Sequence, residues 1–224
     1  MPIFRAGNAV VYFAHVPKSG GTSIERALIE SDYKLSFWNT KFWKKKEEVW
    51  YKSSPQHIPK VHFEDIFADD FFDYKFSVVR DPVSRFLSAF NHNRKRIGRM
   101  VSVESFVSRL EKNKKNQNDF FGAVFDDHFL PSRRFIPEGT ELFYLEDGME
   151  HVLASVSKAI GSKVIQGQRL NVRGYDVHDA KSAFARSIKK VMFPPSPRPE
   201  EIGECLRHRI RILYEEDWPL FERG

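Results

Sequence analysis

Cysteine is almost absent from this sequence: Cys205 is the only one among 224 residues. A lone cysteine excludes an intrachain disulfide framework and any metal site built from several cysteines, and it is typical of a reducing compartment. Long apolar runs are also missing, because the run from Ala9 to Ala14 is far shorter than the ~18 residues that a membrane-spanning helix needs. We therefore expect a cytoplasmic protein with no transmembrane segment.

The rest of the composition is that of a globular chain with excess positive charge. Hydrophobic residues make up 41% and aromatic residues 14% of the sequence, which is enough for a full core without a disulfide or zinc. We expect residues 1–224 to form a single domain. Lysine and arginine number 36 against 30 aspartates and glutamates, and the net charge of +6 predicts attraction to anionic partners such as a nucleotide, an anionic glycan or nucleic acid.

Apolar runs that end in polar turns and lead into helical patterns recur along the chain. Asn8 to Val16 alternates β-branched and aromatic residues, and a glycine-containing turn then leads into a helical run, Thr22 to Glu30. Tyr74 to Val79 is a second buried-strand candidate. Asp81 is suited to cap the helical pattern that follows, in which Val83 to His92 carries apolar residues at helical spacing.

A third unit of the same kind follows later in the chain. Glu141 to Leu145 reads as a strand and Gly148 to Ile160 as the helix after it. Elsewhere we expect a helix at Val103 to Leu110, an exposed loop at Lys112 to Asn118 and an amphipathic stretch at Pro199 to Leu213. Three strand-to-helix units predict an α/β fold with a parallel sheet flanked by helices on both faces.

The segment His15 to Ser23 (HVPKSGGTS) has the components of a phosphate-type anion site. Its two glycines free the backbone to curl, the helix that follows offers unpaired N–H groups, and Lys18 and two hydroxyl residues add donors. The nucleotide-triphosphatase loop places its lysine after the last glycine, whereas Lys18 precedes Gly20 and Gly21. The order of residues therefore disfavours a Walker-type ATPase or kinase.

Arg80 follows the second predicted strand, and Ser88 lies eight residues later, two turns into the predicted helix. The carboxyl end of a parallel strand faces the crevice in which open α/β sheets bind ligands. A guanidinium and a hydroxyl that converge there suit a second phosphate. The two anion sites together predict a ligand that is charged at both ends.

At these residues the sequence resembles the sulfotransferase superfamily, in particular the membrane-associated carbohydrate sulfotransferases and their bacterial relatives. The 5′-phosphosulfate loop of that family is similar to PKSGGTS at 17–23, and its 3′-phosphate motif to RDPVSRFLSAF at 80–90. The family's His-aromatic-x-Pro motif is similar to HFLPSRRF at 128–135, and its C-terminal motif to YEEDWPLF at 214–221. The resemblance extends over nearly the whole chain.

The resemblance implies a P-loop-like nucleotide-binding fold and a sulfotransferase activity. It implies 3′-phosphoadenosine 5′-phosphosulfate (PAPS) as the donor, a carbohydrate or glycolipid hydroxyl as the acceptor, and no metal. The resemblance also implies that Lys18 contacts the oxygen that bridges the sulfate and the phosphate of PAPS. The residues that it assigns to the 5′-phosphate loop are Lys18, Ser19, Gly20, Gly21, Thr22 and Ser23, and those that it assigns to the 3′-phosphate are Arg80 and Ser88.

The acceptor hydroxyl also needs a base, and histidine suits that role near neutral pH. We choose His57, because relatives place a histidine between the two anion motifs. His62 is the runner-up, and His15 lies in the anion loop, where it is better suited to orient the loop. Glu64 and Asp65 are further alternatives, since some sulfotransferases use a carboxylate.

Two further features belong to the resemblance or to the charge pattern. The family's late loop over the nucleotide corresponds to Gln168–Tyr175, in which Asn171 and Arg173 are candidate nucleotide ligands; Val172 and Arg173 replace the usual Lys-Ser pair. Three basic patches suit an anionic acceptor: Lys41–Lys46, Arg94–Arg99 and Lys112–Lys115. Trp38 and Trp43 are suited to stack on sugar rings.

Two other functions stay open. A divergent nucleotide kinase would share the anion loop but would require magnesium, and a non-enzymatic polyanion-binding protein would use the basic face alone. The sequence contains no recognition helix, zinc knuckle or RNA-binding aromatic pair, so we expect no specific nucleic-acid partner. It carries no signal for an oligomeric state.

Overall fold

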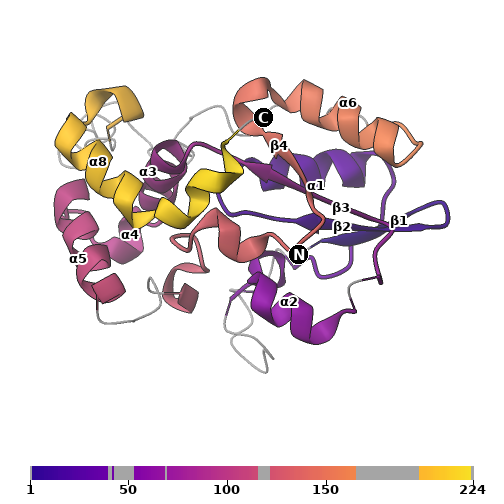
Figure 1. Cartoon of the computed structure of the whole chain (residues 1–224), viewed down its shortest axis with the longest axis horizontal. Helices are drawn as coiled ribbons and strands as arrows, with labels where there is room; N and C mark the ends of the chain where they lie inside the picture. Colours follow the sequence, from indigo (N-terminus) through magenta and orange to yellow (C-terminus); the bar gives the residue numbers. More distant parts are fainter. Residues whose placement is uncertain are drawn as a thin grey trace, which may run out of the picture.

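The computed structural model of the chain describes residues 2–39, 42, 53–68, 70–115, 122–164 and 197–222. A four-stranded sheet forms its centre, in the order β1 (Ile3–Ala6), β2 (Ala9–Ala14), β3 (Tyr74–Val79) and β4 (Glu141–Tyr144). Strands β2, β3 and β4 are parallel, so their carboxyl ends lie at the same edge of the sheet (Figure 1). The predicted α/β architecture is confirmed.

Strand β1 corrects the expectation of a wholly parallel sheet. It pairs antiparallel with β2, with Ala6 opposite Ala9, and only Gly7 and Asn8 connect the two strands. Gly7 has a φ of +60°, the left-handed backbone that tight hairpin turns require and that glycine adopts without strain. The sheet is therefore mostly parallel, with one antiparallel edge strand.

Each parallel strand leads into a helix. Helix α1 (Gly21–Glu30) follows β2, α3 (Pro82–His92) follows β3, and α6 (Met149–Ala159) follows β4. The predicted cap of α3 is confirmed, because the carboxylate of Asp81 accepts the backbone N–H of Ser84 at 2.8 Å. The strand-to-helix units expected from the sequence are thus present.

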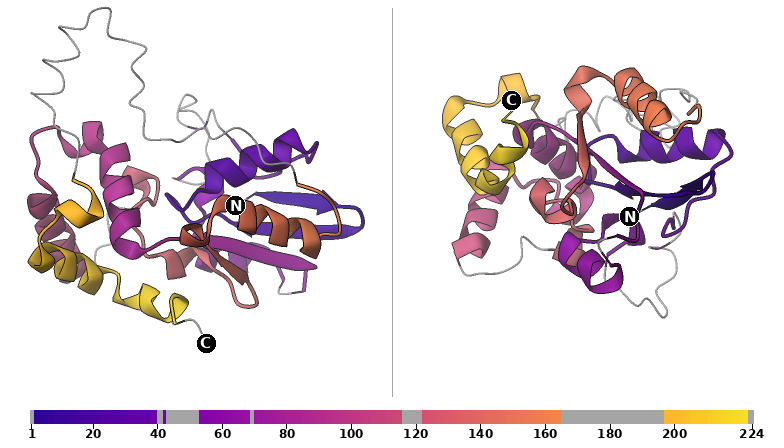
Figure 2. Two further views of the ribbon diagram at one scale, coloured as in Figure 1. Left: turned by 90° about the horizontal axis from the view of Figure 1, so that it is seen from above. Right: turned by 45° about the vertical axis from the view of Figure 1, so that its right-hand side comes forward.

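The two faces of the sheet are covered by different helices. Val11 and Phe13 of β2 pack with the apolar residues of α1 and α6 on one face, and Tyr12 and Ala14 pack with α2 (Lys60–Ile66) on the other. Figure 2 shows α1 and α6 together on one side of the sheet and α2 on the opposite side. The alternation of side chains along β2 therefore places helices on both faces.

A second core lies beside the sheet and consists mainly of helices. Helix α3 packs there against α5 (Val103–Lys115) and α8 (Glu204–Leu213), with α4 (Arg94–Ile97) alongside (Figure 1). The expected loop at Lys112–Asn118 is wrong for Lys112–Lys115, which continue α5; lysines in the last turn favour the helix because they face the negative end of its dipole. Short 3₁₀ segments are η2 (Pro55–His57), η3 (Gly122–Phe125), η4 (Ser132–Phe135), η5 (Leu145–Asp147), η7 (Pro199–Glu201) and η8 (Glu215–Leu220).

A buried arginine joins the two ends of this second core. Arg85 of α3 is fully buried and donates to the backbone carbonyl oxygens of His128 (3.4 Å) and Leu130 (2.7 Å), with its guanidinium 5.0 Å from the ring centre of Tyr214. Asp217 of η8 lies 3.8 Å from the same guanidinium and accepts two backbone N–H groups of η4 at 2.9 Å each. These contacts bind the C-terminal segment to the loop that carries His128.

Among the residues described, no helix combines the length and the apolar character needed to cross a membrane.

Candidate functional site

The loop after β2 presents backbone N–H groups at the start of α1. Lys18 and Gly20 both have positive φ, at 69° and 89°, so the chain curls tightly around this point. Helix α1 begins without a side-chain cap and has no acidic residue in its first turn. Within the described part of the chain, the buried hydroxyl Oγ of Ser19 has no hydrogen-bond partner. Uncapped N–H groups and an unpaired hydroxyl fit a bound anion.

The loop holds this shape because a buried ring lies against it. A Cβ built on Gly21 would lie 2.0 Å from Nε2 of His15, so no larger residue fits while that ring stays in place. Nδ1 of His15 lies 2.6 Å from Oε1 of Glu25 on α1, and Nε1 of Trp38 donates to Oε2 of Glu25 at 3.2 Å. His15 therefore supports the loop from behind, as the sequence predicted, and Trp38 takes part in that support.

The charge states of His15 and Glu25 follow from burial and hydrogen bonding. Burial lowers the pKa of His15 below its usual range, against the raising effect of Glu25. Burial alone would raise the pKa of Glu25, but the charge and hydrogen bond of His15 outweigh it and the pKa is lowered. Glu25 is therefore ionised at neutral pH and accepts the Nδ1–H of a neutral imidazole.

The two predicted anion motifs lie next to one another. Nη1 of Arg80, at the end of β3, is 3.5 Å from the backbone oxygen of Lys18, and both side chains are half-buried. Burial, and secondly the charge of Arg80, lower the pKa of Lys18 to about 8. Two cations held together at partial burial form a site that favours an anion.

The other predicted nucleotide ligands lie on the helices that leave this edge. Ser23 on α1 is half-buried and Thr22 is exposed, one turn or less from the uncapped end. Ser88 is half-buried on α3, on the same helix face as Ser84 and exposed His92 because these positions are four residues apart. The face of α3 that carries Ser88 is therefore partly accessible to solvent.

The predicted base, His57, is held by a carboxylate that the sequence did not point to. Nδ1 of His57 lies 2.9 Å from Oδ2 of Asp126 and 3.2 Å from Oγ of Ser54. Asp126 also accepts the N–H of Ser54 at 2.6 Å and its hydroxyl at 2.9 Å. Burial opposes ionisation of Asp126, but the charge and hydrogen bonds of these partners lower its pKa well below its usual range.

Because an ionised carboxylate can only accept, Nδ1 of His57 carries the proton. The lone pair of the neutral ring is then at Nε2, the nitrogen that faces away from Asp126. Asp126 reaches this position from a left-handed backbone, with φ of 56°, followed by Asp127 with φ of 58°. Strain of this kind persists where the surrounding structure demands it, and it is concentrated at functional sites.

Four histidines from distant parts of the chain lie together at this edge. Ring centres are 4.8 Å apart between His15 and His57, 5.1 Å between His57 and His128, and 4.8 Å between His128 and His92. Desolvation of the ring by its neighbours, followed by the charge of Lys18, lowers the pKa of His92 to about 4, although part of its side chain is exposed. Burial also lowers the pKa of His128 well below its usual range. His92 and His128, like His15, are therefore uncharged at neutral pH.

Two of these histidines, together with Asp126, have the spacing of a metal site. One nitrogen each from His57 and His128 and an oxygen of Asp126 lie within 4.8 Å of one another. Their hydrogen bonds oppose that use: Asp126 accepts Nδ1–H of His57, and Asn93 donates to Nδ1 of His128 at 2.9 Å. A cation bound at both Nδ1 atoms would have to displace these two hydrogen bonds, and it would lie near the lysine charge that acts on His128. The hydrogen bonds at the two Nδ1 atoms therefore favour imidazoles held in fixed tautomers over metal ligation through these atoms.

The remaining predicted residues are more peripheral or lie elsewhere. The runner-up His62 and the alternative carboxylates Glu64 and Asp65 are exposed on α2. Arg94 of the basic patch donates to two backbone oxygens of the following turn, at 2.7 and 2.9 Å. The late loop Gln168–Tyr175, with Asn171 and Arg173, lies outside the described residues, as do Lys41, Trp43 and Lys44–Lys46.

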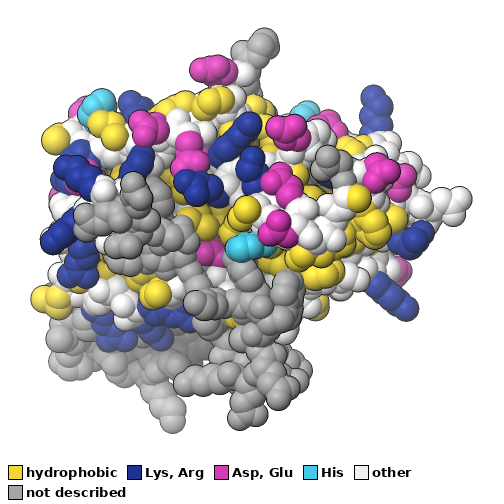
Figure 3. All heavy atoms as spheres, turned by 60° about the horizontal axis from the view of Figure 1, so that its bottom comes forward, with side chains coloured by type: hydrophobic (Ala, Val, Ile, Leu, Met, Phe, Trp, Pro, Cys, Tyr) yellow, Lys and Arg dark blue, Asp and Glu magenta, His cyan; other side chains and the backbone are white. Residues whose placement is uncertain are grey.

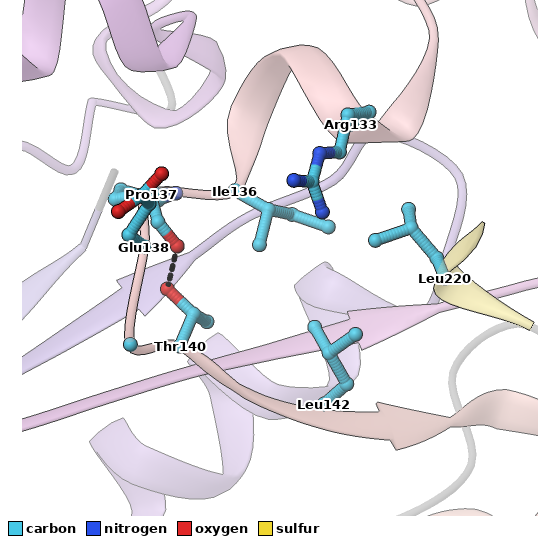
Figure 4. Close-up of a pocket in the computed structure, with 8 residues that line it drawn as sticks. Arg133, Ile136, Pro137, Glu138, Thr140, Leu142 and Leu220 are labelled. Atoms are coloured by element: carbon cyan, nitrogen blue, oxygen red, sulfur yellow. Dashed lines mark hydrogen bonds between the residues drawn. The ribbon is translucent and has the colours of Figure 1, made fainter. Parts of the chain in front are cut away.

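A hollow of about 260 Å³ lies elsewhere, at the start of β4 (Figure 4). Arg133, Leu142 and Leu220 line it, and on its other side the hydroxyl of Thr140 donates to the backbone oxygen of Pro137 at 2.7 Å. Thr140 precedes β4, so this hollow lies at the amino end of the strand and away from the edge that carries Lys18 and Arg80. It is not part of the candidate site.

Sequence reasoning identified two members of the histidine row, His15 and His57, but not the groups around them. His128 was noted only as part of a motif, and His92, Asp126, Asn93 and Glu25 carried no signal. Each of them acquires its role from a contact across the fold; Asp126, for example, lies 69 residues from His57. No local pattern marks such a pair.

Comparisons with known proteins give a family match and a structural neighbour of low similarity. The model of a sulfotransferase family matches residues 1–137. A crystal structure of a sulfotransferase from Alicyclobacillus acidocaldarius is 14% identical, covers 95% of this chain and 98% of its own, and superposes with a TM-score of 0.40. No curated protein matches the chain.

Proposed function

The chain belongs to the sulfotransferase family, and on that premise we propose that it moves a sulfuryl group from PAPS to a hydroxyl of a carbohydrate or glycolipid. The observation that carries the proposal is the juxtaposition of an anion loop with an oriented histidine. Lys18 and Arg80 lie at the same edge of the sheet as His57, whose Nδ1 is hydrogen-bonded to Asp126. That edge contains both an anion site and a base.

The donor fits the loop by its charges. The uncapped start of α1 and the unpaired hydroxyl of Ser19 suit the 5′-phosphate, with Gly20, Gly21, Thr22 and Ser23 around it. Arg80 and Ser88 suit the 3′-phosphate, and Lys18 suits the oxygen between sulfur and phosphorus. PAPS supplies the activated sulfuryl group; the chain supplies position and positive charge.

The transfer needs little beyond alignment and one proton acceptor. The acceptor oxygen forms a bond to sulfur while the bond between sulfur and the phosphate oxygen breaks. The hydroxyl proton passes to Nε2 of His57, and 3′-phosphoadenosine 5′-phosphate (PAP) leaves with the electron pair of the broken bond. Lys18 neutralises the charge that develops on the leaving oxygen, and Asp126 stabilises the imidazolium of His57.

An anionic saccharide is the acceptor that the surface favours. In Figure 3, lysine and arginine side chains are frequent along the left of the face, where α5 and α8 lie in Figure 1. The predicted patch Arg94–Arg99 begins directly after α3, whose last turn carries His92 beside the histidine row. A polyanion along this surface would present a hydroxyl near His57.

Calorimetric titration with PAP in the presence of EDTA tests the donor site, with adenosine diphosphate as the ligand without a 3′-phosphate. We expect micromolar binding that needs the 3′-phosphate. Lys18→Ala and Arg80→Ala should weaken it at least about tenfold, because each removes a charge-assisted contact. Lys158→Ala, an exposed lysine on α6, is the matched control.

Turnover is then measured as PAP release from PAPS with desulfated glycosaminoglycans and glycolipids as acceptors. Magnesium-dependent nucleotide binding without preference for the 3′-phosphate would favour a kinase instead. Salt-sensitive binding of long polyanions without any binding of PAP would favour the polyanion-binding function. Either result overturns the proposal.

A further inference from the structure

Besides His57, the site contains a second buried imidazole whose proton position is set by its neighbours. His128 lies next to His57, with ring centres 5.1 Å apart at an interplanar angle of 62°. Its Nδ1 lies 2.9 Å from Nδ2 of Asn93, and that nitrogen is also 3.0 Å from the backbone oxygen of Ala89. The mechanism above makes no use of this ring.

The contact with Ala89 settles which end of the Asn93 amide faces the ring. A backbone carbonyl oxygen only accepts hydrogen bonds, so the amide atom that lies 3.0 Å from it is the nitrogen. The same NH₂ group then donates its second hydrogen to Nδ1 of His128. Nδ1 of His128 is therefore an acceptor without a proton, and the proton of the neutral ring is on Nε2.

His57 has the opposite arrangement. Its Nδ1 carries the proton and donates to Asp126, which leaves Nε2 as the acceptor. Two neighbouring rings thus present one lone pair and one N–H at the same edge of the sheet. Asn93 also resists a second proton on His128, because its NH₂ hydrogens face the position that this proton would occupy.

Given the proposed sulfuryl transfer, we propose that His128 is a second catalytic residue, an imidazole that donates its Nε2–H to an oxygen of the transferring sulfuryl group. The sulfuryl group passes between the acceptor hydroxyl at His57 and the leaving oxygen at Lys18. His128 touches the ring of His57 and is close enough to Lys18 for that charge to lower its pKa. It therefore lies near both groups, and the proposal places its Nε2–H beside the path of the sulfuryl oxygens.

A neutral donor suits this position for a chemical reason. The sulfuryl oxygens carry negative charge throughout the transfer, and a donor fixed in place stabilises them without reorganising. A ring that could take up a proton would compete with His57 for the proton of the acceptor. The hydrogen bond from Asn93 prevents that competition, so Asn93 is a positioning residue for His128.

Nitrogen-15 NMR of the histidine side chains tests the tautomers without any turnover. We expect an Nε2–H signal for His128 and an Nδ1–H signal for His57 at pH 7, both in the free protein and with PAP bound. Asn93→Asp should reverse the tautomer of His128, because a carboxylate accepts where the amide donates. A proton on Nδ1 of His128 in the natural protein overturns the proposal.

Kinetics with PAPS and the best acceptor of the screen test the donor role. His128→Leu should lower kcat by about 10²–10³-fold, the effect of removing one preorganised donor, with little change in KM for PAPS. His128→Gln, whose amide NH₂ reaches the position of Nε2–H, should restore most of this loss. His57→Gln should not be active, because an amide cannot accept the proton. His151→Gln, an exposed histidine on α6, is the control.

The outcomes separate this inference from the proposed function. If wild-type protein fails to bind PAP, the sulfotransferase site itself is wrong. If it binds PAP and transfers sulfate while folded His128→Leu keeps its kcat, only the role of His128 is wrong. If His128→Leu fails to fold, the role of His128 is tested by the kinetics of His128→Gln and Asn93→Asp and by the tautomers that NMR shows.

Discussion

The support of the anion loop by His15 predicts a severe effect of the smallest possible change at Gly21. In Gly21→Ala the new Cβ would lie 2.0 Å from Nε2, 2.2 Å from Cδ2 and 2.6 Å from Cε1 of His15. Non-bonded carbon atoms pack at about 3.5–4.0 Å, so either the ring or the loop must move by more than about 1 Å. The ring is not free to move, because Glu25 holds Nδ1 at 2.6 Å and Phe13 stacks against it.

The loop therefore takes up the displacement. Overpacking of a close-packed site costs about 1–3 kcal/mol, and a loss of about 2 kcal/mol in binding corresponds to roughly 30-fold weaker affinity. We expect Gly21→Ala to weaken the binding of PAP by about that factor. Calorimetric titration measures it, and thermal unfolding reports any general loss of stability.

Gly203→Ala is the matched control, because a Cβ there meets no atom within 4 Å and the φ of −62° suits any residue. His15→Ala combined with Gly21→Ala is the decisive variant, since removal of the ring makes room for the new methyl group. The double variant should bind PAP better than the sum of the two single losses predicts, by about 0.5–3 kcal/mol of coupling. Strictly additive losses, or unchanged binding by Gly21→Ala, would refute the support of the loop by His15.

Three further results are expected. Burial and a neighbouring guanidinium lower the pKa of Lys18 to about 8. The affinity for PAP should therefore not depend on the titration of Lys18 below pH 8, and above pH 8 it should fall by up to tenfold per pH unit. Calorimetric titrations at several pH values measure this fall, which Lys18→Met should lack. Because the pKa values of His15 and His128 are lowered in the folded state, the free energy of unfolding is fully present above pH ~6.5 and falls as the pH falls below that value. We expect a loss of up to ~1.4 kcal/mol per pH unit for each histidine, measured by denaturant unfolding. His128→Gln should show a smaller dependence on pH. Arg85→Met should destabilise the protein by about 3–5 kcal/mol in the same assay, because it leaves the buried carboxylate of Asp217 without its cation; an unchanged unfolding midpoint would contradict the buried pair.

The sequence predicted those parts of the molecule whose signals are local. The run Tyr74–Val79 is a strand whose last four residues are buried, and it is bounded by a turn. Asp81 caps α3 through a hydrogen bond within one helical turn. Strand β1 was missed because four residues are too few to show an alternation, although the Gly7-Asn8 pair after it is a hairpin signal.

The residues of the candidate site that the sequence predicted are likewise those with local signals. The anion loop was visible because its glycines, lysine and hydroxyls are consecutive. The partners that orient the imidazoles were not, because Asp126 reaches His57 only once η3 and the turn after it have packed against Ser54. Which nitrogen of a histidine carries a proton depends on such neighbours, so it is a property of the fold rather than of the sequence.

The buried contacts of the C-terminal segment make the loop of His128 dependent on residues far away in the sequence. The hydroxyl of Tyr214 donates to the backbone oxygen of Phe129 at 3.0 Å, and Asp217 accepts two backbone N–H groups of η4, so residues 214–217 hold this loop in place. Contacts between residues so far apart form late in folding, because the long intervening chain must first be closed into a loop. We therefore expect a refolding chain to order the loop of His128 only after the C-terminal segment has packed against it.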